Sequence, residues 1–244
     1  MSPLTDETSA LHARVRRDGF AFVTAEVMRG VLGSSELSDW AAFAASWNDL
    51  APDTYLAASG RHRRRRHATF AAEIGGEIQR QPHRAHFQSL AHNPLQGDIQ
   101  RWFAPIRPLL ANGPSMRRIL DVSRNLFEPM APQTRHWHIE AHQFRIEARA
   151  GEPGEPTPEG THRDGVDFVL VLLIDRDNIE SGTTTIHADG ALLGSFTLTH
   201  ALDAALVDDA RVSHGVTAVT AFDPSKPAHR DVLVITFRDA QRAG

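Results

Sequence analysis

The stretch GTHRDGVDFVLVLLI, residues 160–174, decides which fold to expect from this chain. Residues 168–174 form an uninterrupted apolar run, rich in β-branched side chains, which predicts a buried strand. A loop rich in proline and glycine, residues 151–160, leads directly into it. His162 and Asp164 lie between the loop and the strand. We therefore expect a buried strand whose entrance carries chemically active side chains.

The segments around this stretch predict a mainly β second half and a helical first half. Short strands joined by turn signals are typical of a barrel or a double-sheet jelly roll. We expect one domain over residues 1–244, in which a helical half of about residues 1–130 buttresses one sheet of a β core at about residues 133–239. The expected strands are residues 19–23, 137–147, 183–187, 191–198, 211–219 and 231–237, and the expected helices are residues 4–17, 35–47, 93–103 and 115–127.

His162, Asp164 and His214 are the candidate metal ligands. Two imidazoles and one carboxylate can occupy one face of an Fe(II) ion and leave the opposite positions open, as in non-haem iron oxygenases. A second His-x-Asp pair, His187 and Asp189, has a different context. Asp189 is followed by glycine between two strand-like runs, which predicts a hairpin turn. We therefore expect His187 to end a strand and not to bind metal.

Arg230 is the candidate partner for a carboxylate of 2-oxoglutarate. A guanidinium group can hold a carboxylate through two parallel hydrogen bonds. Arg230 precedes the last expected strand, so its side chain can reach the interior of a barrel. The alternative is a surface salt bridge with Asp231, but neighbouring residues of a strand point to opposite faces.

Several segments of the chain resemble the bacterial 2OG-Fe dioxygenase family, which contains free L-amino-acid hydroxylases and a biofilm, stress and motility protein. The resemblance covers roughly residues 18 to 238, and its last three segments are the most specific. The segments are residues 18–20, 63–66, 86–89, 160–165, 208–214 and 229–234.

The resemblance implies a fold, a set of cofactors and an activity. The implied fold is α+β and mainly β, a double-stranded β-helix (jelly roll, cupin-like) buttressed by N-terminal helices. His162, Asp164 and His214 would bind Fe(II), and Arg230 would bind 2-oxoglutarate, with Arg238 as a weaker candidate. The co-substrates would be 2-oxoglutarate and O2. The reaction would hydroxylate, or oxidise at sulfur, a free L-amino acid or a derivative.

Composition narrows the classes of partner. The formal net charge is −4, which argues against a general nucleic-acid binder. The chain has no cysteine, which excludes disulfides, cysteine-bound zinc and a thiol nucleophile. The N-terminus shows no signal-peptide pattern, and residues 168–174 are too short to span a membrane. We expect a cytoplasmic protein with a small-molecule substrate and no membrane or nucleic-acid partner; a homodimer is compatible with the sequence.

Two groups of side chains leave alternatives open. In the basic run of residues 61–67, a strand would send Arg63 and Arg65 to one face and Arg64 and Arg66 to the other; one face would reach the active-site mouth and the other would be solvated. Gln88 and Ser89 are either cap or pocket residues. For an amino-acid substrate, the carboxylate would be bound by Arg145, Arg63 or Arg65, and the ammonium group by Glu140 or Asp167.

A histidine-rich strand supports a rival hypothesis. His138 and His142 share one face of the expected strand and either line the pocket or are structural. His136 and His138, with Glu140 or His142, would bind a metal in a cupin that does not use 2-oxoglutarate. A third hypothesis is a non-catalytic protein that keeps the fold.

Overall fold

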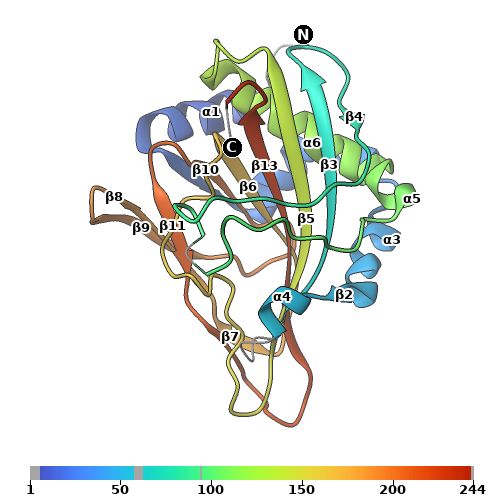
Figure 1. The fold of residues 1–244 in the computed structure, drawn as a ribbon, viewed down its shortest axis with the longest axis vertical. Helices are drawn as coiled ribbons and strands as arrows, with labels where there is room; N and C mark the ends of the chain where they lie inside the picture. Colours follow the sequence, from blue (N-terminus) through green and yellow to red (C-terminus); the bar gives the residue numbers. More distant parts are fainter. Residues whose placement is uncertain (1–5, 58–62, 94, 243–244) are drawn as a thin grey trace.

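The computed structural model describes residues 6–57, 63–93 and 95–242 (Figure 1). The helices are mostly in the first half of the chain, as expected. They are α1 (Asp6–Asp18), α2 (Ala25–Leu32), α3 (Trp40–Ala45), α4 (Thr54–Ala57), α5 (Pro108–Ala111) and α6 (Pro114–Phe127), with 3-10 turns η1 (Ser34–Glu36), η2 (Ser46–Asp49) and η3 (Glu128–Met130).

The strands of the described residues form one large and two small antiparallel sheets. The large sheet has eight strands in the order β1-β10-β6-β13-β5-β3-β2, with β4 paired to β3, and the small sheets are β11-β8-β9 and β12-β7. The strands are β1 (Phe20–Val23), β2 (Ala51–Pro52), β3 (Arg63–Glu73), β4 (Gln79–Arg80), β5 (His136–Ala148), β6 (Phe168–Asp177), β7 (Ile179–Ser181), β8 (Thr183–Ala188), β9 (Ala191–Thr197), β10 (Ala204–Asp208), β11 (Ser213–Val216), β12 (Val219–Ala221) and β13 (Ala228–Asp239).

Strand β6, the apolar run of the sequence, is buried on both faces. Leu170 and Leu172 pack with the helices in the main core, whereas Val169 and Leu173 pack on the other face of the sheet, in clusters shared with the small sheets. In Figure 1, β8, β9 and β11 lie at the left of the view, whereas α3 and α5 lie at the right. The expected fold class, a mainly β jelly roll buttressed by helices, is confirmed.

Helix α6 is fastened to the large sheet by aromatic side chains. The ring of Phe127 stacks on Phe168 of β6 with centroids 4.9 Å apart, and it meets Phe237 of β13 edge-on at 5.4 Å. Trp137 of β5 meets Phe237 edge-on at 5.7 Å. Aromatic pairs in these arrangements stabilise a core beyond the apolar area that they bury.

Two expected helices were wrong. Residues 35–47 do not form one helix, because α3 begins only at Trp40 and the Asp39 carboxylate instead accepts hydrogen bonds from the Ser115 N–H and hydroxyl at 2.8 and 2.5 Å. Residues 95–98 form a turn instead, because the Asn93 side chain accepts the N–H groups of residues 95 and 96, and the backbone of Arg101 pairs with that of His86. Local hydrogen bonds from Asn side chains favour turns over helix in this way.

Other expectations about local structure were confirmed or incomplete. The predicted hairpin joins β8 to β9, with Asp189 and Gly190 at φ of 51° and 79°. Strand β10 was not predicted, and the expected strand at residues 211–219 is divided between β11 and β12, which belong to different sheets. Arg61 and His62 lie outside the described residues. No helix within the described ranges is long and apolar enough to cross a membrane.

We predict that Phe127→Ala lowers the free energy of unfolding by about 3–5 kcal/mol, because the side chain is fully buried between α6 and the large sheet. Leu109→Ala is the matched control, since Leu109 is 89% exposed, and it should change stability by about 0.5 kcal/mol or less. Urea unfolding followed by circular dichroism measures both. Equal midpoints for the two variants would contradict a helix layer held on the sheet by this contact.

Candidate metal centre

The structure brings His162, Asp164 and His214 together. Asp164 Oδ1 lies 3.5 Å from His162 Nε2, and Asp164 Oδ2 lies 3.7 Å from His214 Nε2. The backbones of His162 and His214 form a reciprocal pair of hydrogen bonds, both 2.9 Å long, so that the loop before β6 runs beside β11. The three candidate ligand atoms all lie within 4.8 Å of one another.

The hydrogen bonding of His162 suits a metal ligand. Its Nδ1 lies 3.0 Å from the carbonyl oxygen of Gly160. A carbonyl oxygen only accepts, so Nδ1 carries the proton and the lone pair of Nε2 faces Asp164. Metal-binding histidines are commonly oriented by such a bond from the other ring nitrogen. His187, by contrast, lies in β8 opposite Ser213 and does not line the cavity described below.

The charges of His162, Asp164 and His214 shift one another's pKa values. Burial lowers the pKa of His162, but the Asp164 carboxylate and Glu159 outweigh burial and raise it to about 9. Burial raises the pKa of Asp164, but the bond to His162 and the nearby His214 hold it below its ordinary value. Burial lowers the pKa of His214 in spite of Asp164. These shifts follow from the close packing of two imidazoles around one carboxylate.

Asp209 fixes the backbone that presents Asp164. Its carboxylate accepts the N–H groups of Asp164, Gly165 and Val166 at 2.9, 2.9 and 3.1 Å. Burial and the charge of Asp164 raise the pKa of Asp209, whereas these three donors act in the opposite direction. Gly165 has φ of 79°, and a Cβ there would lie 2.5 Å from the ring of His92. This role of Asp209 could not be predicted from the sequence, because Asp209 becomes a neighbour of the loop only in the folded chain.

One cavity of about 500 Å³ is lined by the metal-ligand candidates and by Arg230. Arg230 is 2% exposed, and its Nε and Nη2 have no hydrogen-bond partner among the described residues. Burial, reinforced by the charge of Arg176, lowers its pKa to about 10. The alternative salt bridge with Asp231 is not formed, since Asp231 pairs with Arg145 at 2.6 Å.

The alternation expected along the basic strand is observed. Arg63 and Arg65 line the cavity, whereas Arg64 pairs with Glu147 and Arg66 pairs with Asp49 on the other face. Arg145 was a wrong candidate for the substrate carboxylate, because it points away from the cavity to Asp231.

Among the remaining candidates, Gln88 lines the cavity and touches the metal-ligand group. Its amide nitrogen lies 3.4 Å from Asp164 Oδ1, and its amide oxygen accepts from Arg101 at 2.8 Å. Arg238 also lines the cavity, and it donates to the carbonyl of Arg242. Asp167 does not line it and accepts instead from the Asp239 N–H.

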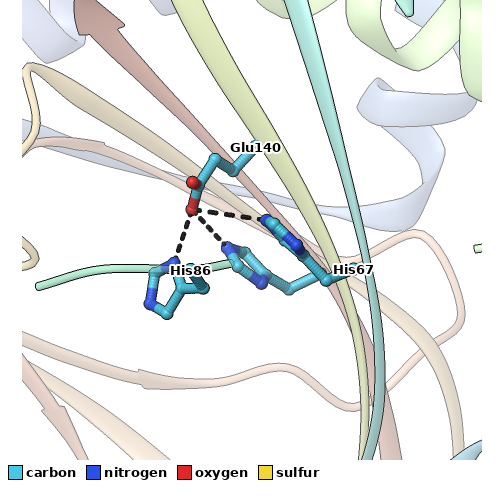
Figure 2. Close-up of side chains that lie close together, drawn as sticks. His67, His86 and Glu140 are labelled. Carbon is cyan, nitrogen blue, oxygen red and sulfur yellow. Dashed lines mark hydrogen bonds and ion pairs between the residues drawn. The ribbon is translucent and has the colours of Figure 1, made fainter. Parts of the chain in front are cut away.

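A second group of polar side chains, which we call the Glu140 cluster, consists of Glu140, His67, His86, His138 and His142. Figure 2 shows His67 and His86 directed at the Glu140 carboxylate. Oε2 lies 2.7 Å from His86 Nδ1, 3.2 Å from His142 Nε2 and 3.6 Å from His67 Nε2, and Oε1 lies 3.2 Å from His138 Nε2.

Strand alternation predicted that His138 and His142 share a face, but His67 and His86 were missed because β3 and the 86–101 bridge reach β5 only through tertiary pairing. His136, which the rival metal hypothesis used, is exposed and lies outside the cluster. A third group, Asp175, His229 and Asp231, does not line the cavity.

Comparisons with known proteins place this architecture in a family. The family model described as 2OG-Fe dioxygenase matches residues 44–236. The crystal structure of a bsmA homolog from Methylobium petroleophilum PM1 is 35% identical, with a TM-score of 0.85, over 96% of this chain and 93% of that one. The 3(1)-hydroxy-L-isoleucine 4-dioxygenase of Pantoea ananatis is 29% identical over 155 residues, and the bifunctional enzyme flvA of Aspergillus flavus is 34% identical over 106 residues.

The two curated relatives are matched over only part of their length. The aligned residues make up 62% of this chain and 62% of the Pantoea protein, and 37% of this chain and 13% of the Aspergillus protein. The family match, by contrast, extends from the end of α3 into β13 and includes both the metal-ligand candidates and the Glu140 cluster. The chain therefore belongs to the 2OG-Fe dioxygenase family, whose members use Fe(II) with 2-oxoglutarate and O2 as co-substrates.

Proposed function

We propose that this protein is an Fe(II)- and 2-oxoglutarate-dependent dioxygenase that hydroxylates, or oxidises at sulfur, a free L-amino acid or a close derivative. The observation that carries the proposal is the meeting of His162, Asp164, His214 and the buried Arg230 around one cavity of about 500 Å³. A cavity of this volume is typical of small-molecule sites. The similarity to an enzyme named for a hydroxylated isoleucine supports the amino-acid class.

In this proposal, His162 Nε2, an oxygen of Asp164 and His214 Nε2 hold the iron. The donor set fits, because two imidazole nitrogens and one carboxylate face a common point and His162 Nε2 has its lone pair turned inward. Bound Fe(II) supplies O2 activation coupled to the decarboxylation of 2-oxoglutarate. The chain itself supplies binding, orientation and the exclusion of water. Asp209 keeps Asp164 in place through the loop amides.

Arg230 binds the far carboxylate of 2-oxoglutarate in this proposal. A buried guanidinium with two unsatisfied nitrogen atoms is costly unless a ligand supplies an anion. A carboxylate can accept from two guanidinium nitrogens at once, which matches the two free donors.

We also propose that the helical and β halves act as one domain, that the protein is cytoplasmic, and that it has no nucleic-acid or membrane partner. The slightly negative net charge argues against a nucleic-acid partner. The packing of α6 on the large sheet supports a single domain.

His162→Ala, Asp164→Ala and His214→Ala should each lose stoichiometric iron and abolish turnover, because two remaining ligands cannot hold the ion on one face. His187→Ala is the matched control and should keep both, since its side chain does not line the cavity. Metal analysis after anaerobic loading with Fe(II) gives the answer. Iron kept by Asp164→Ala but lost from His187→Ala would reverse the assignment.

Arg230→Ala should weaken 2-oxoglutarate binding by about thirtyfold or more, because the co-substrate loses a buried charge partner. Iron should remain bound in this variant. Arg238→Ala is the control, and it should change 2-oxoglutarate binding little. Titration of the Mn(II)-loaded protein with 2-oxoglutarate measures both constants, and the opposite ranking would show that Arg238 is the binding residue.

The reaction itself is tested with a pool of free L-amino acids, Fe(II), ascorbate and 2-oxoglutarate. We expect a gain of one oxygen atom on one or a few amino acids, with release of succinate, and no product with Asp164→Ala. Mass spectrometry of the pool is the measurement. The proposal is wrong if no amino acid is oxidised while a peptide, nucleic acid or lipid is.

A further inference from the structure

The wall of the cavity beyond the metal-ligand candidates carries charged groups that the proposed chemistry does not use. Glu140, Arg65 and Arg101 all line it. Gln88 connects this wall to the metal-ligand group, since it bonds Arg101 at 2.8 Å and lies 3.4 Å from Asp164 Oδ1. A ligand group bound at this wall would therefore lie one side chain away from the candidate iron site.

Glu140 has no lysine or arginine ion-pair partner in the described part of the chain. Its ion-pair partners there are all histidines, and the pKa values of His67 and His142 are lowered, chiefly by burial, so that both rings are neutral at pH 7. Burial alone would raise the pKa of Glu140, yet the surrounding histidines hold it well below its ordinary value. The carboxylate is thus ionised, and its ion-pair partners in the described residues are histidine ring nitrogens.

The two carboxylate oxygens of Glu140 differ in their hydrogen bonding. Oε2 faces three histidines, of which Figure 2 labels His67 and His86, whereas Oε1 has the single partner His138 at 3.2 Å in the described residues. A carboxylate oxygen can accept two hydrogen bonds. Oε1 therefore has room for a further donor from the cavity.

Arg101 is the complementary unpaired cation. It is 1% exposed, and its two hydrogen bonds within the described residues go to the amide oxygens of Gln88 and Gln96. Its Nε has no partner there. Arg65 is equally buried, and its nearest carboxylate, Asp53 at 3.9 Å, is already held by Arg63 at 2.7 Å. Burial, followed by the charge of Arg63, lowers the pKa of both arginines.

Given the proposed function, on which this step rests, we propose that Glu140 binds the α-ammonium group of an α-amino-acid substrate and that Arg101, supported by Arg65, binds its α-carboxylate. Arg230 is taken by 2-oxoglutarate. In the cavity wall, Glu140 supplies an anion and Arg65 and Arg101 supply a cationic pair, and together these charges are the complement of a zwitterion. Buried charges of this kind are costly in the free protein and become favourable when a ligand pairs them.

The same histidines and Glu140 offer the atoms of a second metal site, but Arg65 argues against one. Arg65 Nη2 lies 2.7 Å from His142 Nδ1. A guanidinium only donates, so Nδ1 is the acceptor and the proton of His142 sits on Nε2, which faces Glu140. A protonated nitrogen cannot bind a metal, whereas an ammonium group that donates to Glu140 needs no change in these bonds.

The test uses the protein loaded with Mn(II) and 2-oxoglutarate. Calorimetric titration with each proteinogenic L-amino acid identifies the tightest, and its 2-hydroxy acid of the same carbon skeleton is the matched probe without ammonium. Glu140→Gln should weaken the amino acid by about tenfold or more and the 2-hydroxy acid by about twofold or less. Arg101→Gln should weaken both alike, because both carry the carboxylate. Glu147→Gln and Arg66→Gln are controls outside the cavity and should change neither.

Each contrary outcome has its own meaning. Equal losses for the two probes in Glu140→Gln, or none, would overturn the head-group site while normal 2-oxoglutarate binding leaves the proposed function standing. If the wild-type protein binds Mn(II) and 2-oxoglutarate but no amino acid, both the head-group site and the amino-acid substrate class are wrong. A second equivalent of Mn(II) that disappears in Glu140→Gln would replace the head-group site by a metal site.

Discussion

Two backbone hydrogen bonds of 2.9 Å between His162 and His214 hold the functional part of this molecule together. They join the loop that precedes β6 to β11, so that residues 52 positions apart (214 − 162) present their imidazoles to the same carboxylate. Asp209 completes the arrangement by accepting three N–H groups of the loop that carries Asp164. The loop that carries His162 and Asp164 is thus held by backbone contacts with strand β11 and with Asp209, which positions ligands more accurately than a free loop does.

The cavity is lined by several charged side chains that have no full counter-charge in the free protein. Arg230 and Arg101 are buried without a carboxylate partner in the described residues, and the ion-pair partners of Glu140 there are all histidines. Each of these groups costs stability in the free state. The aromatic and aliphatic core on the other face of the large sheet, where α6 packs, provides the compensating stability. Charge that is unsatisfied before binding gives affinity and orientation once ligands enter.

Part of the site could be predicted from the sequence, and the rest could not. His162 and Asp164 stand two residues apart before an apolar strand, and strand alternation correctly separated Arg63 and Arg65, which line the cavity, from Arg64 and Arg66. Alternation also placed His138 and His142 on one face with Glu140 between them. The roles of Asp209, Arg101 and His86 could not be predicted from local pattern, because their partners come from other segments of the chain. The helix expected at residues 93–103 was wrong for the same reason, since the backbone of Arg101 pairs with His86.

The sequence by itself determined the strands with strong periodicity, the hairpin at residues 189–190, the two-residue spacing of the first ligands and the excess of histidine on one strand. These depend on interactions within a few residues, or on which face of a strand is apolar. Only the tertiary structure decided which charges meet in the cavity. The pairing of β3 with β5 brings His67 to Glu140, and the turn at residues 93–101 brings Arg101 to Gln88. Such contacts depend on the register between distant strands, which is fixed by packing the whole apolar core at once and not by any local pattern.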